Sequence, residues 1–297
     1  MQFSRVMASL IEIIRQESES LAPISTQVSP VLKEIPGIRC VLFDVYGTLM
    51  VSGVGDISLS NAEDRGKAIS DLFEAMAIPL KKDLSEPGKD LNGIIAEHQD
   101  KSRREGIEYP EVDIREVWSD FVEQNAPTTK TTPEMIEELA IRFELKVNPT
   151  WPMPHAESML RLLREQGLKT GIVSNAQFFT PLLFEAYCGQ SLDALGLRQE
   201  LCQCSYVFRE AKPSVRMYRV NAMTLEAKYG IQPGEVLYVG NDLLNDIVPA
   251  REIGFKTALF AGDKRSLRFR EGDPRVEGVN PDLIITGLDQ LSKCLKN

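Results

Sequence analysis

The feature that most constrains the fold is a series of six short, nearly continuous apolar runs rich in β-branched residues. The runs lie at residues 39–43, 169–174, 204–208, 235–239, 256–260 and 283–285. Such runs are typical of strands buried on both faces of a parallel sheet. Three helical patterns each end in a glycine, as is typical of a helix C-cap, and an apolar run follows within a few residues. These patterns lie at residues 156–166, 215–229 and 246–253. The alternation predicts an α/β fold with a doubly wound parallel sheet.

A long segment between the first and second runs has a different character. From about residue 51 to residue 149 it carries many charges and no convincing strand. Helical periodicity recurs there at residues 62–76, 91–104, 114–123 and 133–143. Because ligands of open α/β sheets bind at the carboxyl ends of the strands, this insert predicts a helical cap over that edge. We expect residues 53–149 to form the cap, and residues 38–52 and 150–297 to form the core.

Residues 1–37 make an N-terminal extension. Apolar side chains recur at spacings of three and four, at Phe3, Met7, Leu10, Ile13 and Ile14. This spacing predicts an amphipathic helix over residues 2–21. Residues 22–36 contain three prolines and several hydroxyl side chains, which is typical of a linker. The helix could bury its apolar face on the core or in a homodimer.

Composition narrows the function classes. Among 297 residues, 43 Asp and Glu outnumber 34 Lys and Arg, for a formal net charge of -9. We therefore expect neither nucleic-acid nor anionic-membrane binding, which need clustered positive charge. No apolar run approaches the roughly 20 residues of a membrane-spanning helix, and no signal peptide is evident. With five scattered cysteines that fit reduced thiols, these features predict a cytoplasmic protein that acts on a small molecule.

The strongest local motif is the run from Val41 to Leu49, which contains Asp44, Tyr46, Gly47 and Thr48. An apolar strand delivers Asp44 to its carboxyl end, and Gly47 allows a sharp turn directly after it. The motif therefore displays a carboxylate at the mouth of a crevice. Alone, it could also be an ordinary strand followed by a turn.

Two further motifs place hydrogen-bond donors after later runs. The second run ends in Ser174 and Asn175, where a hydroxyl and nearby backbone N–H groups can donate to an anionic oxygen. Lys212 stands directly before Pro213, which we expect to start a helix and so leave the lysine free to face a bound phosphate. Without a function in binding, the first motif would be an ordinary polar strand end and Lys212 a solvated surface lysine.

The fourth motif combines a strand end with an acidic cluster. The fourth run is followed by Gly240, Asn241 and Asp242 and, four residues later, by Asp246. Oxygen ligands from Asn241 or Asp242, together with Asp44, would make a hard-cation site suited to Mg²⁺. Asp246 could instead cap the following helix.

With these four motifs in order, the chain resembles the haloacid dehalogenase (HAD) superfamily, a large group that consists mostly of phosphatases. The resemblance covers roughly residues 38–295. It implies a Rossmann-like core in which Asp44 attacks phosphorus to form an aspartyl-phosphate. Ser174 and Lys212 would hold the phosphoryl group, and Thr48 and Asn175 would join them in phosphate binding.

The same resemblance implies a Mg²⁺ cofactor. Its ligands would be the Asp44 side chain, the Tyr46 backbone carbonyl, and the oxygens of Asn241 and Asp242. Asp246 would support these ligands from behind. A carboxylate and a phosphate dianion repel each other, so a cation would have to neutralise charge before attack.

Two positions depart from the family pattern. Most HAD phosphatases have a general-acid aspartate two residues after the nucleophile, but this chain has Tyr46 there, as the family's dehalogenases do. A phenol with an ordinary pKa near 10 is a poor acid and a poor base at pH 7. Asn241 also stands where members commonly have aspartate, which leaves Asp242 to supply the metal-binding carboxylate.

The leading hypothesis is a Mg²⁺-dependent phosphohydrolase that acts on a small phosphorylated metabolite, with Asp44, Tyr46, Ser174 and Lys212 as catalytic residues. Tyr46 adds an alternative, a 2-haloacid dehalogenase-like hydrolase, because halide leaves without a proton and attack on carbon by Asp44 needs no metal. A weakly active HAD-fold binding module is a further alternative. The sequence leaves the substrate open, because cap side chains would select it.

Overall fold

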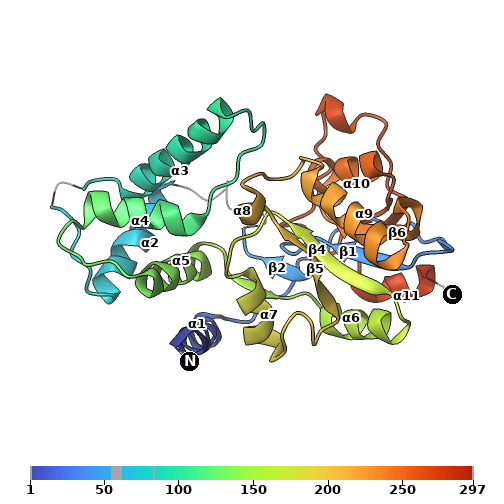
Figure 1. Ribbon diagram of the computed structural model, residues 1–297, viewed down its shortest axis with the longest axis horizontal. Helices are drawn as coiled ribbons and strands as arrows, with labels where there is room; N and C mark the ends of the chain where they lie inside the picture. Colours follow the sequence, from blue (N-terminus) through green and yellow to red (C-terminus); the bar gives the residue numbers. More distant parts are fainter. Residues whose placement is uncertain (1, 55–61, 83, 296–297) are drawn as a thin grey trace.

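The computed structural model describes residues 2–54, 62–82 and 84–295, and its centre is a parallel sheet (Figure 1). The six strands lie in the order β5-β4-β1-β6-β7-β8. Their bounds are β1 Cys40–Phe43, β4 Lys169–Ser174, β5 Leu197–Cys204, β6 Val236–Gly240, β7 Lys256–Phe260 and β8 Leu283–Ile285. Every pairing between neighbours is parallel. The predicted doubly wound α/β fold is confirmed.

The sheet is covered on both faces because side chains of a strand alternate in direction. In β1, Val41 and Phe43 join one hydrophobic cluster, whereas Cys40 and Leu42 join another. The first cluster includes residues of α6 (Ala156–Glu165) and α7 (Thr180–Cys188), and the second includes residues of α9 (Arg216–Tyr229) and α10 (Val248–Ile253). Figure 1 shows these two pairs of helices on opposite sides of the strands. The short α11 (Leu291–Cys294) closes the chain.

One predicted strand is wrong. The run at residues 204–208 forms a short helix, α8 (Ser205–Phe208), and the strand is β5, which ends at Cys204. β5 is at the edge of the sheet, and only Leu197 and Leu201 among its eight residues are fully buried. An edge strand with one buried face carries polar residues, so its sequence lacks the continuous apolar run of the inner strands.

A helical insert lies between the short strands β2 (Met50–Ser52) and β3 (Thr150–Pro152), which pair antiparallel. Its helices are α2 (Ala62–Ala75), α3 (Pro87–Arg104), α4 (Ile114–Asn125) and α5 (Pro133–Val147), close to the predicted ranges. They share a hydrophobic cluster of their own, in which Trp118 contacts the rings of Phe73, Phe121 and Phe143. The insert, whose helices lie at the left of Figure 1, thus has a separate apolar core.

The N-terminal extension is bound along the molecule. α1 spans Gln2–Glu17, so it ends four residues before the predicted boundary. The segment that follows is hydrogen-bonded to the core: Thr26 Oγ1 donates to the Ala261 carbonyl at 2.6 Å, and Val31 pairs with Ile284 of β8. The main chain of Ile35 also donates to the Cys294 carbonyl at 2.9 Å. This segment is therefore part of the core surface and not a free linker.

Two observations bear on the chain as a whole. All five cysteines are free thiols, and Cys202 and Cys204 lie on β5. Among residues 2–54, 62–82 and 84–295, no helix has the length and apolar character needed to cross a bilayer.

Candidate active site

Asp44 follows β1 at the carboxyl edge of the sheet, and its carboxylate is almost fully buried. Ser174 Oγ, at the end of the neighbouring strand β4, donates to Asp44 Oδ1 at 2.8 Å. Lys212 Nζ donates to the same oxygen at 2.7 Å. Because β4 and β1 are adjacent and parallel, their carboxyl ends converge, and the structure brings these three predicted residues together.

A second carboxylate shares the same ammonium group. Lys212 Nζ donates to Asp246 Oδ1 at 2.6 Å, and Tyr238 OH donates to that oxygen at 2.9 Å. Gly240 permits this arrangement because a Cβ there would clash with the Asp246 carboxyl group. Burial disfavours the charge of Lys212, but the carboxylates of Asp246 and Asp44 outweigh it and raise the pKa of Lys212. The lysine is therefore a fixed cation between two buried carboxylates.

The backbone of Lys212 is held by Asn175. Asn175 Oδ1 accepts a hydrogen bond from Lys212 N at 2.7 Å. The prediction that Pro213 starts a helix is wrong, because Lys212 and Pro213 lie in a turn and α9 begins at Arg216. From this turn the lysine side chain reaches Asp44 at the end of β1.

Thr48 and Asn241 tie the loops after β1 and β6 to each other. Thr48 Oγ1 donates to Asn241 Oδ1 at 3.0 Å, and Asn241 Nδ2 donates to the Ser266 carbonyl at 2.7 Å. Gly47, directly before Thr48, has φ +86°, and a side chain there would collide with Ser266. Thr48 and Asn241 therefore hold the loops in place around Asp44, and both polar atoms of the Asn241 amide already have protein partners.

Both carboxylate oxygens of Asp242 also have hydrogen-bond partners within the protein. Its Oδ1 accepts from the backbone N–H groups of Leu244 and Asn245, at 2.9 and 3.1 Å. The guanidinium of Arg270 lies against both carboxylate oxygens and pairs with them. Asp242 thus caps the short helix η3 (Leu243–Ile247) and neutralises an arginine.

These partners decide how well the site fits Mg²⁺, which prefers several free oxygen ligands in octahedral geometry. Of the four predicted ligands, Asp242 accepts hydrogen bonds from protein donors on both carboxylate oxygens, and Asn241 Oδ1 already accepts one from Thr48. Asp44 already pairs with Lys212. In the part of the chain that the structure describes, no three carboxylate, imidazole or thiol groups gather closely enough to hold a metal ion. The donor set in this arrangement does not fit the ion.

Tyr46 lies beside this cluster, and its hydroxyl is 2.8 Å from Thr180 Oγ1 at the start of α7. Burial, reinforced by the charge of Glu144 on α5, raises the pKa of Tyr46 well above its usual range. Tyr46 is thus a neutral hydrogen-bonding group at neutral pH and not a proton donor of carboxyl strength.

A sequence-family comparison then places the chain. The family model described as haloacid dehalogenase-like hydrolase matches residues 38–254. The chain belongs to this family. No curated relative matches the chain by sequence. The protein is therefore a HAD-like hydrolase, an enzyme.

Solved structures of HAD proteins share the fold. The 2-haloacid dehalogenase from Pseudomonas syringae pv. Tomato DC3000 is 16% identical with a TM-score of 0.54, and the similarity covers 86% of this chain and 97% of that one. A HAD phosphatase from Thermococcus onnurineus is 20% identical with a TM-score of 0.50, over 86% and 97% of the two chains. A magnesium-bound HAD hydrolase from Bacillus subtilis is 17% identical over the same shares, with a TM-score of 0.44. Phosphatases and dehalogenases thus both occur among its structural neighbours.

Three residues that sequence reasoning missed complete this HAD-like site: Arg270, Tyr238 and Glu144. Arg270 lies in a stretch after β7 whose backbone is bonded to the fourth motif, since Arg268 N donates to the Asn241 carbonyl at 2.9 Å. Tyr238 is a polar tip within an apolar run. Glu144 is largely buried on α5, and burial raises its pKa to about 7. Glu144 lies one residue beyond the predicted helix 133–143, because α5 extends to Val147, so the sequence pattern gave no sign of it.

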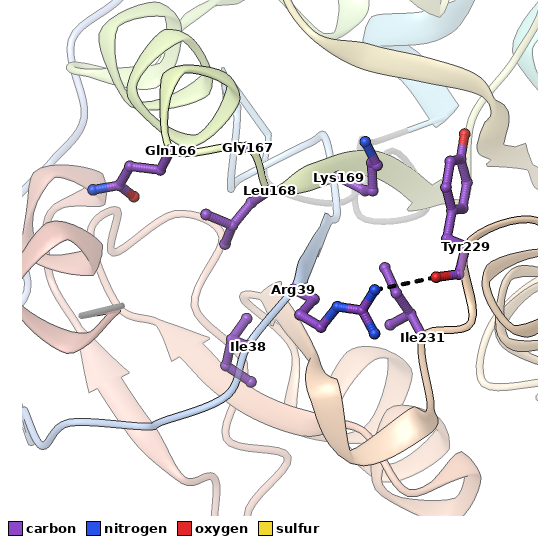
Figure 2. A pocket seen from close by; sticks show the side chains of 8 residues that line it. All are labelled: Ile38, Arg39, Gln166, Gly167, Leu168, Lys169, Tyr229 and Ile231. Atoms are coloured by element: carbon purple, nitrogen blue, oxygen red, sulfur yellow. Dashed lines mark hydrogen bonds between the residues drawn. The ribbon is translucent and has the colours of Figure 1, made fainter.

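A distinct cavity of about 300 Å³ lies at the opposite, amino end of the sheet. Figure 2 shows Arg39, Lys169 and Tyr229 around it, with the Arg39 guanidinium bonded to the Tyr229 carbonyl. None of the predicted site residues lines this cavity. It is therefore separate from the HAD-family site at the carboxyl end.

Proposed function

We propose that the protein is a 2-haloacid dehalogenase-like hydrolase in which Asp44 attacks carbon. The observation that carries this proposal is how the charges are paired. Asp44 is held by Ser174 and Lys212, while the Asp242 carboxylate is already neutralised by Arg270. The nucleophile therefore has a resident counter-cation and needs no further one to be stable in a buried site.

The proposed reaction has two steps. An oxygen of Asp44 forms a bond to the carbon that carries the halogen, and the carbon–halogen bond breaks as halide leaves with the electron pair. Water then attacks the carbonyl carbon of the resulting ester, which releases a hydroxy acid and restores the Asp44 carboxylate. One proton is released per halide. This proton passes to bulk water.

Tyr46 suits this chemistry better than it suits phosphate-ester hydrolysis. A halide needs no proton to leave, whereas an alkoxide leaving group does. The tyrosine is neutral and bonded to Thr180, so it supplies a polar wall to the site without an acid. We also propose that the helical insert is the cap over this site, so that the substrate is a small molecule enclosed between the two parts.

Two assays with the purified full chain test the proposal. Halide release is measured from 2-chloropropionate and phosphate release from 4-nitrophenyl phosphate, each with Mg²⁺ and with excess chelator. We expect halide release that the chelator leaves unchanged. Mg²⁺-dependent phosphate release without halide release would contradict the proposal.

One observation favours a second candidate, a Mg²⁺-dependent phosphohydrolase. Ser174 and Lys212 donate at Asp44, and Asn175 fixes the lysine backbone, and such a set of donors could also hold phosphoryl oxygens. This candidate requires Asp242 to give up Arg270. The Arg270→Gln variant tests it: phosphate release that appears or rises with Mg²⁺ in this variant would favour the phosphohydrolase.

A further inference from the structure

The site is closed in this structure. Asp44, Ser174 and Lys212 have exposed fractions of 5%, 0% and 7%. A small molecule can reach Asp44 only if part of the surrounding protein moves. The helical insert has its own apolar core and joins the rest of the chain through the short β2–β3 ribbon, so it is the part best able to move as a unit.

α1 contacts both parts of the molecule across this seam. It packs against α7 of the core and against α5 of the insert, as Figure 1 shows at the junction of the two parts. Leu10 and Ile14 of α1 are buried in one cluster with Ile141 of α5 and Leu183 of α7. A helix that buries one face on two units at once resists their separation.

The attachment of α1 to the core is the firmer of the two. Arg15 Nε donates to the Ala186 carbonyl at 3.1 Å, at the end of α7. Ser18 Oγ is 2.9 Å from Tyr187 OH, and that hydroxyl is also 3.1 Å from Thr150 Oγ1 of β3. The chain then continues into the segment bonded along the core. α1 is therefore carried by the core when the two parts separate.

The attachment to the insert consists of the apolar contact with α5 and one ion pair. Glu17 at the end of α1 forms this ion pair with Arg142 of α5. Farther toward the start of α1 the seam is incompletely packed, because a cavity of about 420 Å³ lies between Met7 of α1, Pro133 of α5 and Leu182 of α7. Removing the ion pair would leave the apolar contact alone to hold α5.

We propose that α1 is a latch that holds the helical insert closed over Asp44, and that the Glu17–Arg142 ion pair is its release point. The latch acts on access to the site, whichever electrophile Asp44 attacks. Opening breaks the contact between α1 and α5 and leaves α1 on α7.

A thiol placed in the closed site measures opening directly. The Ser174→Cys variant of the full chain is treated with iodoacetamide, and labelling of the peptide that carries residue 174 is followed by mass spectrometry. Glu17→Gln in this background should raise the labelling rate about two- to fivefold, since exposed or partly exposed ion pairs contribute up to about 1 kcal/mol. The readout needs no turnover, so its failure is separate from failure of the proposed function.

Matched controls separate a latch from a general loss of stability. Glu12→Gln removes a carboxylate of the same helix that pairs within α1, with Arg15 and Gln16, and should leave the rate unchanged. The exchanged pair Glu17→Arg with Arg142→Glu, combined with Glu138→Gln because Glu138 also pairs with Arg142, should restore slow labelling. Cys40, fully buried in β1, should label no faster in any variant. An unchanged rate at residue 174 in Glu17→Gln, or an equal rise at Cys40, would overturn the latch.

Discussion

The two ends of the central sheet both gather charged side chains, but only the carboxyl end buries them. Lys212 there has a side-chain exposure of 4% and lies between Asp44 and Asp246. At the amino end, the Arg39 side chain is 48% exposed and contacts Glu235 and backbone carbonyls. Solvent screens the charges at the amino end but not the buried charges at the carboxyl end. The same residue types are therefore reactive groups at the carboxyl end and ordinary exposed side chains at the amino end.

The comparison also explains why a cavity is a poor guide to the site. The amino-end cavity is open, and the Arg39 guanidinium that lines it donates to the backbone carbonyls of Gly230 and Tyr229 (Figure 2). The carboxyl end is closed, and its side chains converge on one oxygen of Asp44. Convergence of buried charges, rather than free volume, marks the place where chemistry occurs.

The largest expected effect is loss of the nucleophile. Asp44→Asn should lower the rate of halide release by at least about 10³-fold, because a nucleophile has no substitute in the site. Asp242→Asn is the matched control: it removes the partner of Arg270 but should keep the rate within about tenfold of the wild type. An equal loss of halide release in both variants would contradict this, because a metal-free mechanism gives Asp242 no direct role.

The next effect concerns stability at the carboxyl end. Lys212→Met leaves Asp44 and Asp246 buried without their cation and should lower the free energy of unfolding by about 3–5 kcal/mol at pH 8. The loss should be smaller at pH 5, because burial raises the pKa of Asp246 to about 7 and this carboxyl group takes up a proton there. Urea unfolding measures both.

Lys169→Met provides the same substitution at the amino end. Lys169 lies 5.2 Å from the Tyr229 ring, and losing such a contact should cost about 0.5–1 kcal/mol. Similar losses in the two lysine variants would break the comparison between the ends.

Glu144 extends the comparison to a buried acid outside the sheet. Burial raises its pKa to about 7 from an ordinary value of 4.5, so the folded state binds the proton more tightly than the unfolded state. The stability this contributes is complete below about pH 4.5 and is lost as the pH rises through 7. Glu144→Gln should therefore be more stable than the wild type at pH 8 by about 1–3 kcal/mol. The free energy of unfolding of both proteins is measured from pH 5 to pH 8. A constant difference between them over this range would contradict the prediction.

The smallest expected effect is at Arg39. Arg39→Gln loses exposed contacts to Glu235 and to the carbonyls of Tyr229 and Gly230. It should change the free energy of unfolding by less than about 1 kcal/mol and leave halide release unchanged. A drop in turnover would show that the amino-end cavity is coupled to the site.

The sequence predicted the parts of the site that depend on local order along the chain. Asp44 and Ser174 each follow an apolar run, and parallel strands that lie side by side bring such residues together. Lys212 could be predicted as a site residue near Asp44, but its turn could not, because a proline after a lysine is compatible with either a helix start or a turn.

Partners chosen by the tertiary fold were beyond the sequence. Asp242 and Arg270 are 28 residues apart, and nothing between them indicates that the loop returns to the fourth motif. Glu144 and Tyr46 come from different units of the molecule. The edge strand β5 was misplaced by several residues because its exposed side is polar. Each miss involves a contact or a burial that local pattern does not encode.

The measurement that tests the central claim most directly is the incorporation of oxygen-18 from labelled water during turnover. The enzyme is allowed many turnovers of 2-chloropropionate in labelled water, and the peptide that contains Asp44 is examined by mass spectrometry. If Asp44 forms an ester with carbon, water attacks the Asp44 carbonyl carbon and the label enters its carboxylate. Label found in the hydroxy-acid product, with none in the Asp44 peptide, would contradict the account.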